Sequence, residues 1–352
     1  MCVLTERATQ SYSPAVAHNT GVCRMSFRAL LASLSDEGAV TTSLETLQDD
    51  VLVDGDVDVE IAWSNLNYKD AIALAGFNII QSFPLVPGID FAGTVTASRD
   101  PRFKAGDSVV ATGWGLSQTH HGGFAQRARV PADWLIALPA ALDPRNAMAI
   151  GTAGLTAMLS VLALEQAGLT PARGEVLVTG ASGGVGSVAI ALLAGLGYRV
   201  VASSGKPAEA DYLRQLGAAD VIARDTLSQP GPPVAAERWA GAIDSVGGQT
   251  LANVLAQTAY RGVVTTCGFV GGRELPSTVL PFILRGVTLA GIDSVQAPRV
   301  LREQAWQRLA SDLDLDLLAS TLSEIPLDAV PATAQQMLGG GRKGRTLVDV
   351  NR

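Results

Sequence analysis

A glycine-rich turn at residues 180–187, GASGGVGS, constrains the fold of this chain more than any other segment. The run before it, EVLVT at 175–179, has an apolar centre and is rich in β-branched residues, and the stretch after it, to about residue 196, consists mainly of Ala and Leu. Glycines in a strand-to-helix turn allow backbone N–H groups to approach a pyrophosphate at the helix N-terminus. The spacing departs from the strict G-x-G-x-x-G pattern, so we predict a dinucleotide site from the context of the turn.

Strand-type and helix-type segments continue to alternate after this turn. Short apolar runs recur at residues 200–202, 221–222, 242–243 and 263–266, which predicts a doubly wound parallel sheet. Before it, short alternating runs between Gly, Pro and Asp turns are typical of a mostly β domain. We therefore expect the 352 residues to form a β domain over 25–150, joined by the returning segment 313–352, and a nucleotide domain over 151–312.

Composition excludes several other classes of protein. A net charge of −7 gives the chain as a whole no basic character that would draw it to nucleic acid or anionic lipid, although it leaves room for local basic pockets, and three cysteines are too few for a disulfide framework. We expect no apolar run long enough to span a membrane. Residues 1–24 lack the apolar block of a secretory signal, so we expect a disordered tail or a mis-assigned start, with a transit peptide as the less favoured alternative. These features predict a cytoplasmic protein.

The segment after the second strand of the nucleotide domain indicates which dinucleotide binds. An acidic residue there accepts a hydrogen bond from the ribose 2′-OH of NAD, whereas cations favour the 2′-phosphate of NADP. The chain has Ser203, Ser204, Gly205 and Lys206 at this place, no carboxylate within 198–208, and a further cation, Arg224, after the third strand. We predict NADPH; the alternative is that both cations are solvated surface charges.

The order of these parts resembles the medium-chain dehydrogenase/reductase superfamily. The resemblance implies a GroES-like β domain followed by a Rossmann domain. Zinc-bearing members carry Gly-His-Glu where this chain has Gly88-Ile89-Asp90, and a Cys where it has residues 66–68. The adjacent His120 and His121 are expected in a polar loop, and Cys267 is expected as a buried apolar residue of a strand. We therefore expect no metal, which favours conjugate reduction over alcohol oxidation.

Within the zinc-free branch, the chain is similar to the acrylyl-CoA reductase family, also described as quinone-oxidoreductase-like. The shared segments are SNLNYKD at 64–70, PGIDFAGTV at 87–95, GTAG at 151–154, the glycine-rich turn, WAGAID at 239–244, PFILRG at 281–286 and GRTLV at 344–348. The resemblance implies NADPH-dependent reduction of acrylyl-CoA to propanoyl-CoA. An NADPH:quinone or general enone reductase and a non-catalytic NADPH-binding protein stay as alternatives, because a fold does not fix a substrate.

The resemblance also implies the residues of the site. The cofactor contacts are Tyr68, Ser182, Gly183, Gly184, Val185, Ser204, Gly205, Lys206 and Arg224, to which we add Phe269, Ile283 and Ser294. The family commonly has Arg where this chain has Lys206, so we expect a less steep preference for NADPH. Tyr68 is the first candidate for a polar contact to the nicotinamide or thioester, and Asn67, Lys69 and Asp70 are candidate catalytic neighbours. Alternatively, Tyr68 only covers the cleft, and Lys69 and Asp70 form a surface ion pair or turn.

Two further expectations concern partners. The phosphates of an acyl-CoA substrate favour Arg or Lys near the cleft, and the candidates are Arg261, Arg285, Arg342, Lys343 and Arg345, with ordinary surface charge as the alternative. Residues 286–292 would form the last strand of the nucleotide sheet, and an unpaired apolar edge predicts a homodimer.

Overall fold

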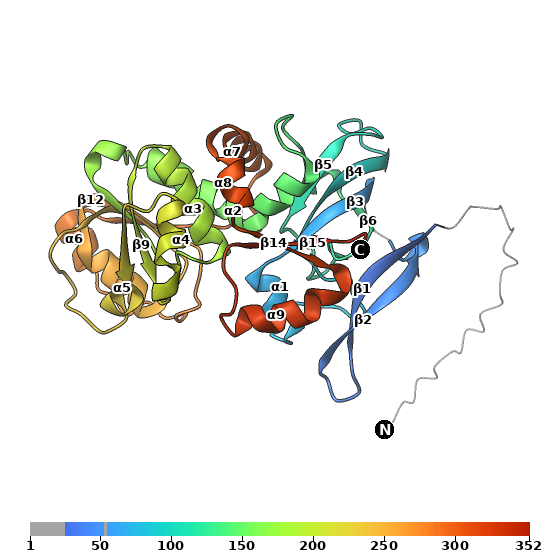
Figure 1. Ribbon diagram of the computed structural model, residues 1–352, viewed down its shortest axis with the longest axis horizontal. Coiled ribbons are helices and arrows are strands. Elements are labelled where there is room, and N and C mark those ends of the chain that lie inside the picture. The colour runs from blue at the N-terminus through green and yellow to red at the C-terminus, as the bar shows by residue number, and fades with distance from the viewer. Residues whose placement is uncertain (1–24, 53–54) are drawn as a thin grey trace, which may run out of the picture.

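The computed structural model describes residues 25–52 and 55–352, which form two large sheets and a small two-stranded one, with helices between and around the large sheets (Figure 1). The tail expected at residues 1–24 lies outside the described residues. Each sheet is assembled from the parts of the chain that the sequence analysis assigned to it. The exact division into domains at residues 150 and 312 stays a prediction.

The nucleotide sheet has six parallel strands in the order β10-β9-β8-β11-β12-β13. This arrangement confirms the Rossmann fold. The strands are β8 (Glu175–Val178), β9 (Arg199–Ser204), β10 (Asp220–Ala223), β11 (Trp239–Asp244), β12 (Thr258–Thr266) and β13 (Thr288–Gly291). Its helices are α3 (Gly184–Gly195), α4 (Ala210–Gln215), α5 (Gly248–Gln257) and α6 (Leu280–Arg285).

Both faces of this sheet are covered, which explains its continuous apolar strands. In β8, Val176 and Val178 belong to the same buried cluster as α3, whereas Leu177 packs in a different cluster with residues of α5. Successive side chains of a strand point to opposite faces, so a strand with helices on both sides needs apolar residues at every position.

The GroES-like sheet has the strand order β14-β15-β3-β4-β5-β7, with β6 also paired to β3. Its strands are β3 (Val57–Leu66), β4 (Asp90–Ser98), β5 (Ser108–Thr112), β6 (Arg127–Val130), β7 (Leu135–Ala137), β14 (Leu322–Pro326) and β15 (Arg345–Asp349). Strand β15 pairs antiparallel with β3, as expected for the returning C-terminal run. Helices α1 (Tyr68–Leu74) and α9 (Val330–Leu338) pack together beside this sheet.

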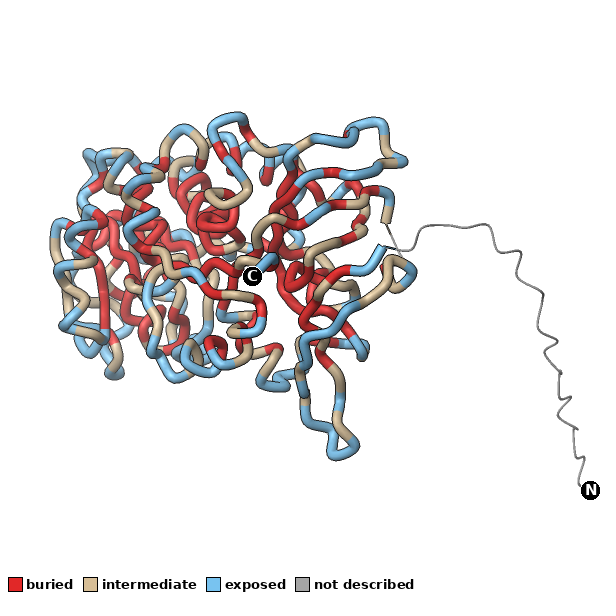
Figure 2. Tube along the Cα trace, turned by 45° about the vertical axis from the view of Figure 1, so that its right-hand side comes forward, coloured by how far each residue is buried: buried red, intermediate tan, exposed pale blue. Residues whose placement is uncertain are grey.

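A hairpin of β1 (Ser26–Leu34) and β2 (Val40–Gln48) forms a separate two-stranded sheet. Figure 2 shows that much of this hairpin is exposed, whereas the centres of both large sheets are buried. Strand β1 is tied to the β domain where Ala29 bridges Ala125 and Ala32 bridges Leu85. The outer strand β2 is therefore the exposed part of the hairpin, and β1 lies against the β domain.

Helix α2 (Pro144–Gln166) connects the two sheets, and α7 (Arg299–Asp312) packs along it, with the short α8 (Leu315–Ala319) nearby (Figure 1). Our expectation from the sequence that no apolar run reaches membrane-spanning length is wrong. Residues 147–164 of α2 carry no charge, so by length and composition alone the helix could cross a membrane. However, 89% of its most apolar stretch is buried inside the protein. A helix that is apolar all round is explained by such burial.

Candidate active site and nucleotide site

The glycine-rich turn adopts the geometry of a phosphate-binding loop. Gly180 has a φ of +60°, and α3 begins at Gly184 with Gly183 as its N-cap. A Cβ added at Gly186 would lie 2.4 Å from the carbonyl oxygen of Gly180, so only glycine allows the helix to pack this closely. The free N–H groups of the α3 N-terminus lie at the carboxyl end of β8, where an anion is favoured by the helix dipole.

The two predicted cations for the 2′-phosphate lie at the carboxyl end of β9. The guanidinium of Arg224 lies against Gly205, since a Cβ added there would be 2.7 Å from Arg224 Cζ. The ammonium of Lys206 is 3.3 Å from Glu209 Oε1 and 3.3 Å from the carbonyl oxygen of Arg342. The structure thus brings Lys206 and Arg224 to the strand end where the sequence places the ribose.

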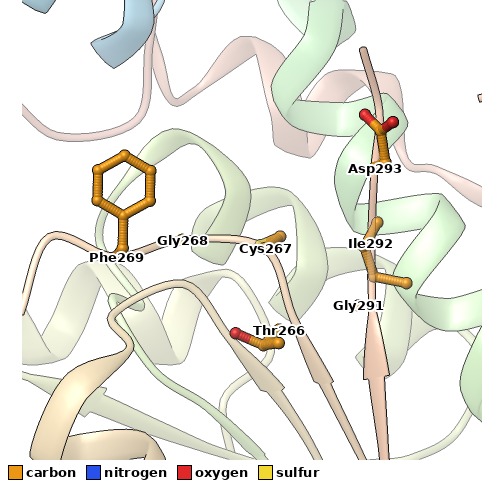
Figure 3. Close-up of a pocket in the computed structure, with 7 residues that line it drawn as sticks. All are labelled: Thr266, Cys267, Gly268, Phe269, Gly291, Ile292 and Asp293. Atoms are coloured by element: carbon orange, nitrogen blue, oxygen red, sulfur yellow. The ribbon is translucent and has the colours of Figure 1, made fainter. Parts of the chain in front are cut away.

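A shallow depression of about 490 Å³ opens at the carboxyl ends of β12 and β13 (Figure 3). Its lining residues are Thr266, Cys267, Gly268, Phe269, Gly291, Ile292 and Asp293. Ser294 follows directly and is buried, and its Oγ accepts a hydrogen bond of 2.8 Å from Thr156. Phe269 and Ser294 therefore lie at the sheet edge where parallel sheets bind ligands.

Cys267 differs from its expected place. It follows β12, is half-buried, and lines the depression, whereas the sequence analysis placed it inside a strand as a buried apolar residue. Strand β12 ends at Thr266, and the Cys267 N–H still donates to the carbonyl oxygen of Asp244, so Cys267 lies directly beyond the carboxyl end of the strand. Burial raises the pKa of the thiol to about 12, so Cys267 is uncharged at neutral pH.

Ile283 is the candidate that the fold separates from the others. It lies on α6, which ends three residues before β13 begins, and is 69% exposed. The neighbouring Arg285 donates to the carbonyl oxygen of Thr258, the first residue of β12. Ile283 therefore lies toward the amino ends of the strands, away from the glycine-rich turn of the same chain.

The five candidate CoA cations also divide by position. Arg285 belongs to the amino end of the sheet, and Arg261 lies early in β12, where its carbonyl oxygen accepts from Arg173. Arg345 is buried. Arg342 and Lys343 instead lie beside the nucleotide site, because the Lys343 ammonium stands 4.9 Å from the ring centre of Tyr212 on α4.

The four candidate catalytic residues form the first turn of α1. Asn67 is the N-cap, and its backbone N–H donates to Asp70 Oδ2 at 2.9 Å, as in a capping box. The N–H of Ile89 donates to Asp70 Oδ1, also at 2.9 Å. Asp70 is wholly buried, which contradicts the alternative of a surface ion pair, whereas its hydrogen bond to Asn67 agrees with the other alternative, a turn. Tyr68, in contrast, is 45% exposed.

Lys69 is half-buried in the same turn. Burial lowers the pKa of its ammonium, and the carboxylates of Asp70, Asp90 and Asp293 act in the opposite direction. Asp293, one of these carboxylates, lines the depression at the end of β13 (Figure 3).

A buried polar network beneath this turn was not predicted. Asp90 Oδ2 accepts hydrogen bonds from the Thr152 N–H at 2.7 Å and from Asn67 Nδ2 at 3.0 Å, and Thr152 Oγ1 donates to Asp90 Oδ1. Asn67 Nδ2 also donates to Asn65 Oδ1. Arg345 Nη1 donates to Asn67 Oδ1 at 3.2 Å. The sequence contained a signal for this network in the shared segments PGID and GTAG, because they include Asp90 and Thr152.

Arg345 joins this network to the nucleotide site. A Cβ added at Gly184 would lie 2.9 Å from Arg345 Nη1, so the guanidinium lies between the α3 N-terminus and Asn67. Burial lowers the pKa of Arg345 to about 10, while Asp90 and Asp70 favour its charged form. It therefore remains a cation at neutral pH.

The position of Asp70 predicts a pH-dependent stability. Burial raises the pKa of its carboxyl from 3.8 to about 7, against the two N–H donors that favour the carboxylate. The folded protein thus holds a proton that the unfolded chain releases, so this contribution is complete below pH 3.8 and is lost as the pH rises to about 7. We expect Asp70→Asn to flatten the fall in the free energy of unfolding between pH 5 and about 7. Urea unfolding at a series of pH values measures how the free energy of unfolding changes with pH in the parent and the variant.

The exposed Asp211 provides the control for this prediction, because Asp211→Asn removes a carboxylate of α4 that is largely in solvent. We expect that variant to keep the slope of the parent. An unchanged slope in Asp70→Asn would contradict the assignment of the proton to Asp70.

Comparison with known proteins identifies the family. Residues 53–140 match the alcohol dehydrogenase GroES-like domain, and residues 184–311 match the zinc-binding dehydrogenase model. The chain is 53% identical to the probable acrylyl-CoA reductase AcuI of Escherichia coli, over 92% of this chain and 100% of that protein. The chain belongs to the acrylyl-CoA reductase family of medium-chain dehydrogenases/reductases. AcuI of Ruegeria pomeroyi is 49% identical over 92% of this chain and 99% of its own length.

Two solved structures of this family share the fold closely. The yhdH oxidoreductase of Salmonella enterica, in complex with NADP, has a TM-score of 0.90 and 53% identity over 92% of this chain and 99% of that chain. The yhfP protein of Bacillus subtilis, with NAD bound, has a TM-score of 0.90 and 45% identity over the same shares. These likenesses confirm the GroES-like and Rossmann architecture.

The residues at the candidate site do not fit the zinc ion that one family description names. Among the described residues, no three His, Cys, Asp or Glu side chains group together to hold a metal. Ile89 and Asn67 stand in the segments where zinc-bearing relatives have ligands. Asp90 already accepts hydrogen bonds from Thr152 and Asn67, so its carboxylate serves the protein network.

Proposed function

We propose that this chain is an NADPH-dependent reductase of the C=C bond of a short enoyl-CoA thioester, acrylyl-CoA first, and that it works without a metal. The position of Arg345 between Asn67 and Gly184 carries the proposal. It places the first turn of α1 beside the N-terminus of α3, so a dinucleotide on the glycine-rich turn would reach the candidate catalytic residues. The likeness to the AcuI proteins supports the substrate class.

The residues at this junction differ in their exposure to solvent, and the role that we propose for each follows from it. NADPH supplies a hydride when it is bound. Tyr68 is exposed beside the junction, so its hydroxyl is the candidate donor to a thioester oxygen that gains negative charge. Lys69 adds a half-buried positive charge to the same turn. Asn67 and Asp70 are buried and fix the turn, which makes them positioning residues.

The first experiment compares acceptors by the loss of NADPH absorbance. Acrylyl-CoA, crotonyl-CoA and a simple quinone are measured side by side, each with NADPH and with NADH. We expect the highest kcat/KM with acrylyl-CoA and NADPH. Turnover of the quinone alone would overturn the assignment of an enoyl-CoA substrate. NADPH binding without turnover of any acceptor would favour a non-catalytic protein. Prior dialysis against a chelator should leave the rate unchanged.

We expect Tyr68→Phe to lower kcat with acrylyl-CoA about a hundredfold to a thousandfold, the range for one donor to a developing oxyanion. The phenyl ring still covers the cleft, so the KM for NADPH should change less than twofold. Steady-state kinetics of the pure variant check this. If kcat stays at the parent value, Tyr68 only covers the site.

We also propose a cytoplasmic homodimer joined at the outer edge of β13. No strand in the described residues pairs with that edge, and the nearby Val279, Ile283 and Leu284 are largely exposed. Pairing with a second copy would satisfy the edge and cover the apolar side chains. Light scattering after size-exclusion chromatography should give twice the mass of one chain, and Ile283→Glu should give a monomer. A parent that elutes at the mass of one chain would overturn the dimer.

A further inference from the structure

The ammonium of Lys206 is shared between two groups of the protein. Glu209 Oε1 lies 3.3 Å away, and so does the carbonyl oxygen of Arg342. The Glu209 side chain is 13% exposed, whereas that of Lys206 is 40% exposed. The cation predicted for the 2′-phosphate therefore already has a carboxylate partner, and that partner is mostly removed from water.

The same cluster contains two buried polar atoms without a hydrogen-bond partner among the described residues. They are Glu209 Oε2, an acceptor, and Arg342 Nε, a donor. Such atoms cost free energy and are rare in folded proteins. Here an unsatisfied acceptor and an unsatisfied donor belong to two residues that both contact Lys206 Nζ. A shift of side chains that pairs them would satisfy both.

The backbone of Arg342 is already held at the nucleotide site. The N–H of Gly344 donates to the carbonyl oxygen of Ser182 in the glycine-rich turn at 3.1 Å, and Lys343 lies over the ring of Tyr212. Tyr212 in turn donates to Ser187 Oγ on α3. Lys206 Nζ therefore lies between the backbone of Arg342 and the carboxylate of Glu209, 3.3 Å from each.

We propose that Arg342 makes this site selective for a 2′-phosphate by taking over Glu209 from Lys206. The inference rests on the proposed use of NADPH and names the residues that set its preference over NADH. When the 2′-phosphate is present, Lys206 turns to it, because a phosphate dianion attracts the ammonium more strongly than a carboxylate does. Glu209 would then be left as a mostly buried, unpaired charge, which is costly. The guanidinium of Arg342 removes this cost.

A double-mutant cycle tests the exchange. Binding of NADPH and NADH is measured by fluorescence titration without any acceptor, so the result is independent of the substrate proposal. We expect Arg342→Gln to raise the Kd of NADPH about tenfold, within the cost of a buried unsatisfied group, and that of NADH less than twofold. Glu209→Gln should bind NADPH no more weakly than the parent. In Glu209→Gln, adding Arg342→Gln should change the NADPH Kd less than twofold.

Arg214→Gln is the matched control, because it removes the same charge from α4, where Arg214 pairs with the largely exposed Asp211. It should leave both dissociation constants unchanged. If Arg342→Gln weakens NADPH binding equally in the parent and in Glu209→Gln, Arg342 contacts the phosphate directly and the proposed exchange of Glu209 between Lys206 and Arg342 is wrong. Equal effects on NADPH and NADH would also overturn it.

Discussion

Arg345→Met should lower the free energy of unfolding by about 3–5 kcal/mol, the usual cost of removing one partner from a buried charge network. Arg345 donates to the carbonyl oxygen of Ala149 at 2.8 Å and to Asn67 Oδ1, and it is the buried cation next to Asp90 and Asp70. Met fills a similar volume but removes the buried positive charge next to Asp90 and the donor to Asn67 Oδ1. Urea unfolding at neutral pH measures the loss.

Two further variants separate charge from fit. Arg345→Lys keeps the positive charge but loses the planar guanidinium that donates in two directions, so we expect an intermediate loss in the free energy of unfolding. Arg145→Met removes an Arg whose pair with Glu324 is 39% and 33% exposed, and an exposed pair contributes about 1 kcal/mol or less. If Arg345→Met and Arg145→Met destabilise the protein equally, the buried network contributes no more than a surface pair.

Gly151→Ala is expected to destabilise the protein by about 4 kcal/mol through backbone strain and overpacking together. Gly151 interrupts α2 with φ +52° and ψ −160°, a combination that side chains other than hydrogen disfavour. A Cβ there would lie 2.1 Å from Asn65 Nδ2 and 2.8 Å from Asp90 Oδ2. The methyl group would therefore push into the network that holds the first turn of α1. The free energy of unfolding, measured in urea, and kcat should both fall.

Gly38→Ala separates the two causes in this variant. Gly38 also has a positive φ, +78°, but nothing lies within 4 Å of an added Cβ. We expect it to cost about 1 kcal/mol, from backbone strain alone. A Gly151→Ala variant as stable as Gly38→Ala would show that the network moves aside without cost.

The parts of the fold that follow from local patterns were predictable from the sequence. The glycine-rich turn lies between its own strand and helix, so residues 175–196 contain the whole signal. The segment after β9 is equally local, which is why Lys206 was assigned correctly to the end of the second strand. A turn of this kind needs no information from distant parts of the chain.

The polar network could not be predicted in the same way, because its members are far apart in the sequence. Asp90 and Thr152 are 62 positions apart, and Asn67 and Arg345 are 278 apart. No periodicity relates such residues. Asp70 was open to interpretation as a surface residue because its two N–H donors, from Asn67 and Ile89, are known only from the fold. Distant packing likewise decides that Ile283 lies away from the glycine-rich turn.

The place of β15 between β14 and β3 also sets an order of assembly during synthesis. All six strands of the nucleotide sheet lie between residues 175 and 291, so they can associate while translation continues. The other sheet lacks an inner strand until residues 345–349 have left the ribosome. Until then, the edge of β3 and the carboxylate of Asp90 have no partner from that strand. A nascent chain should therefore bind a dinucleotide before the sheet of its β domain has gained its last inner strand.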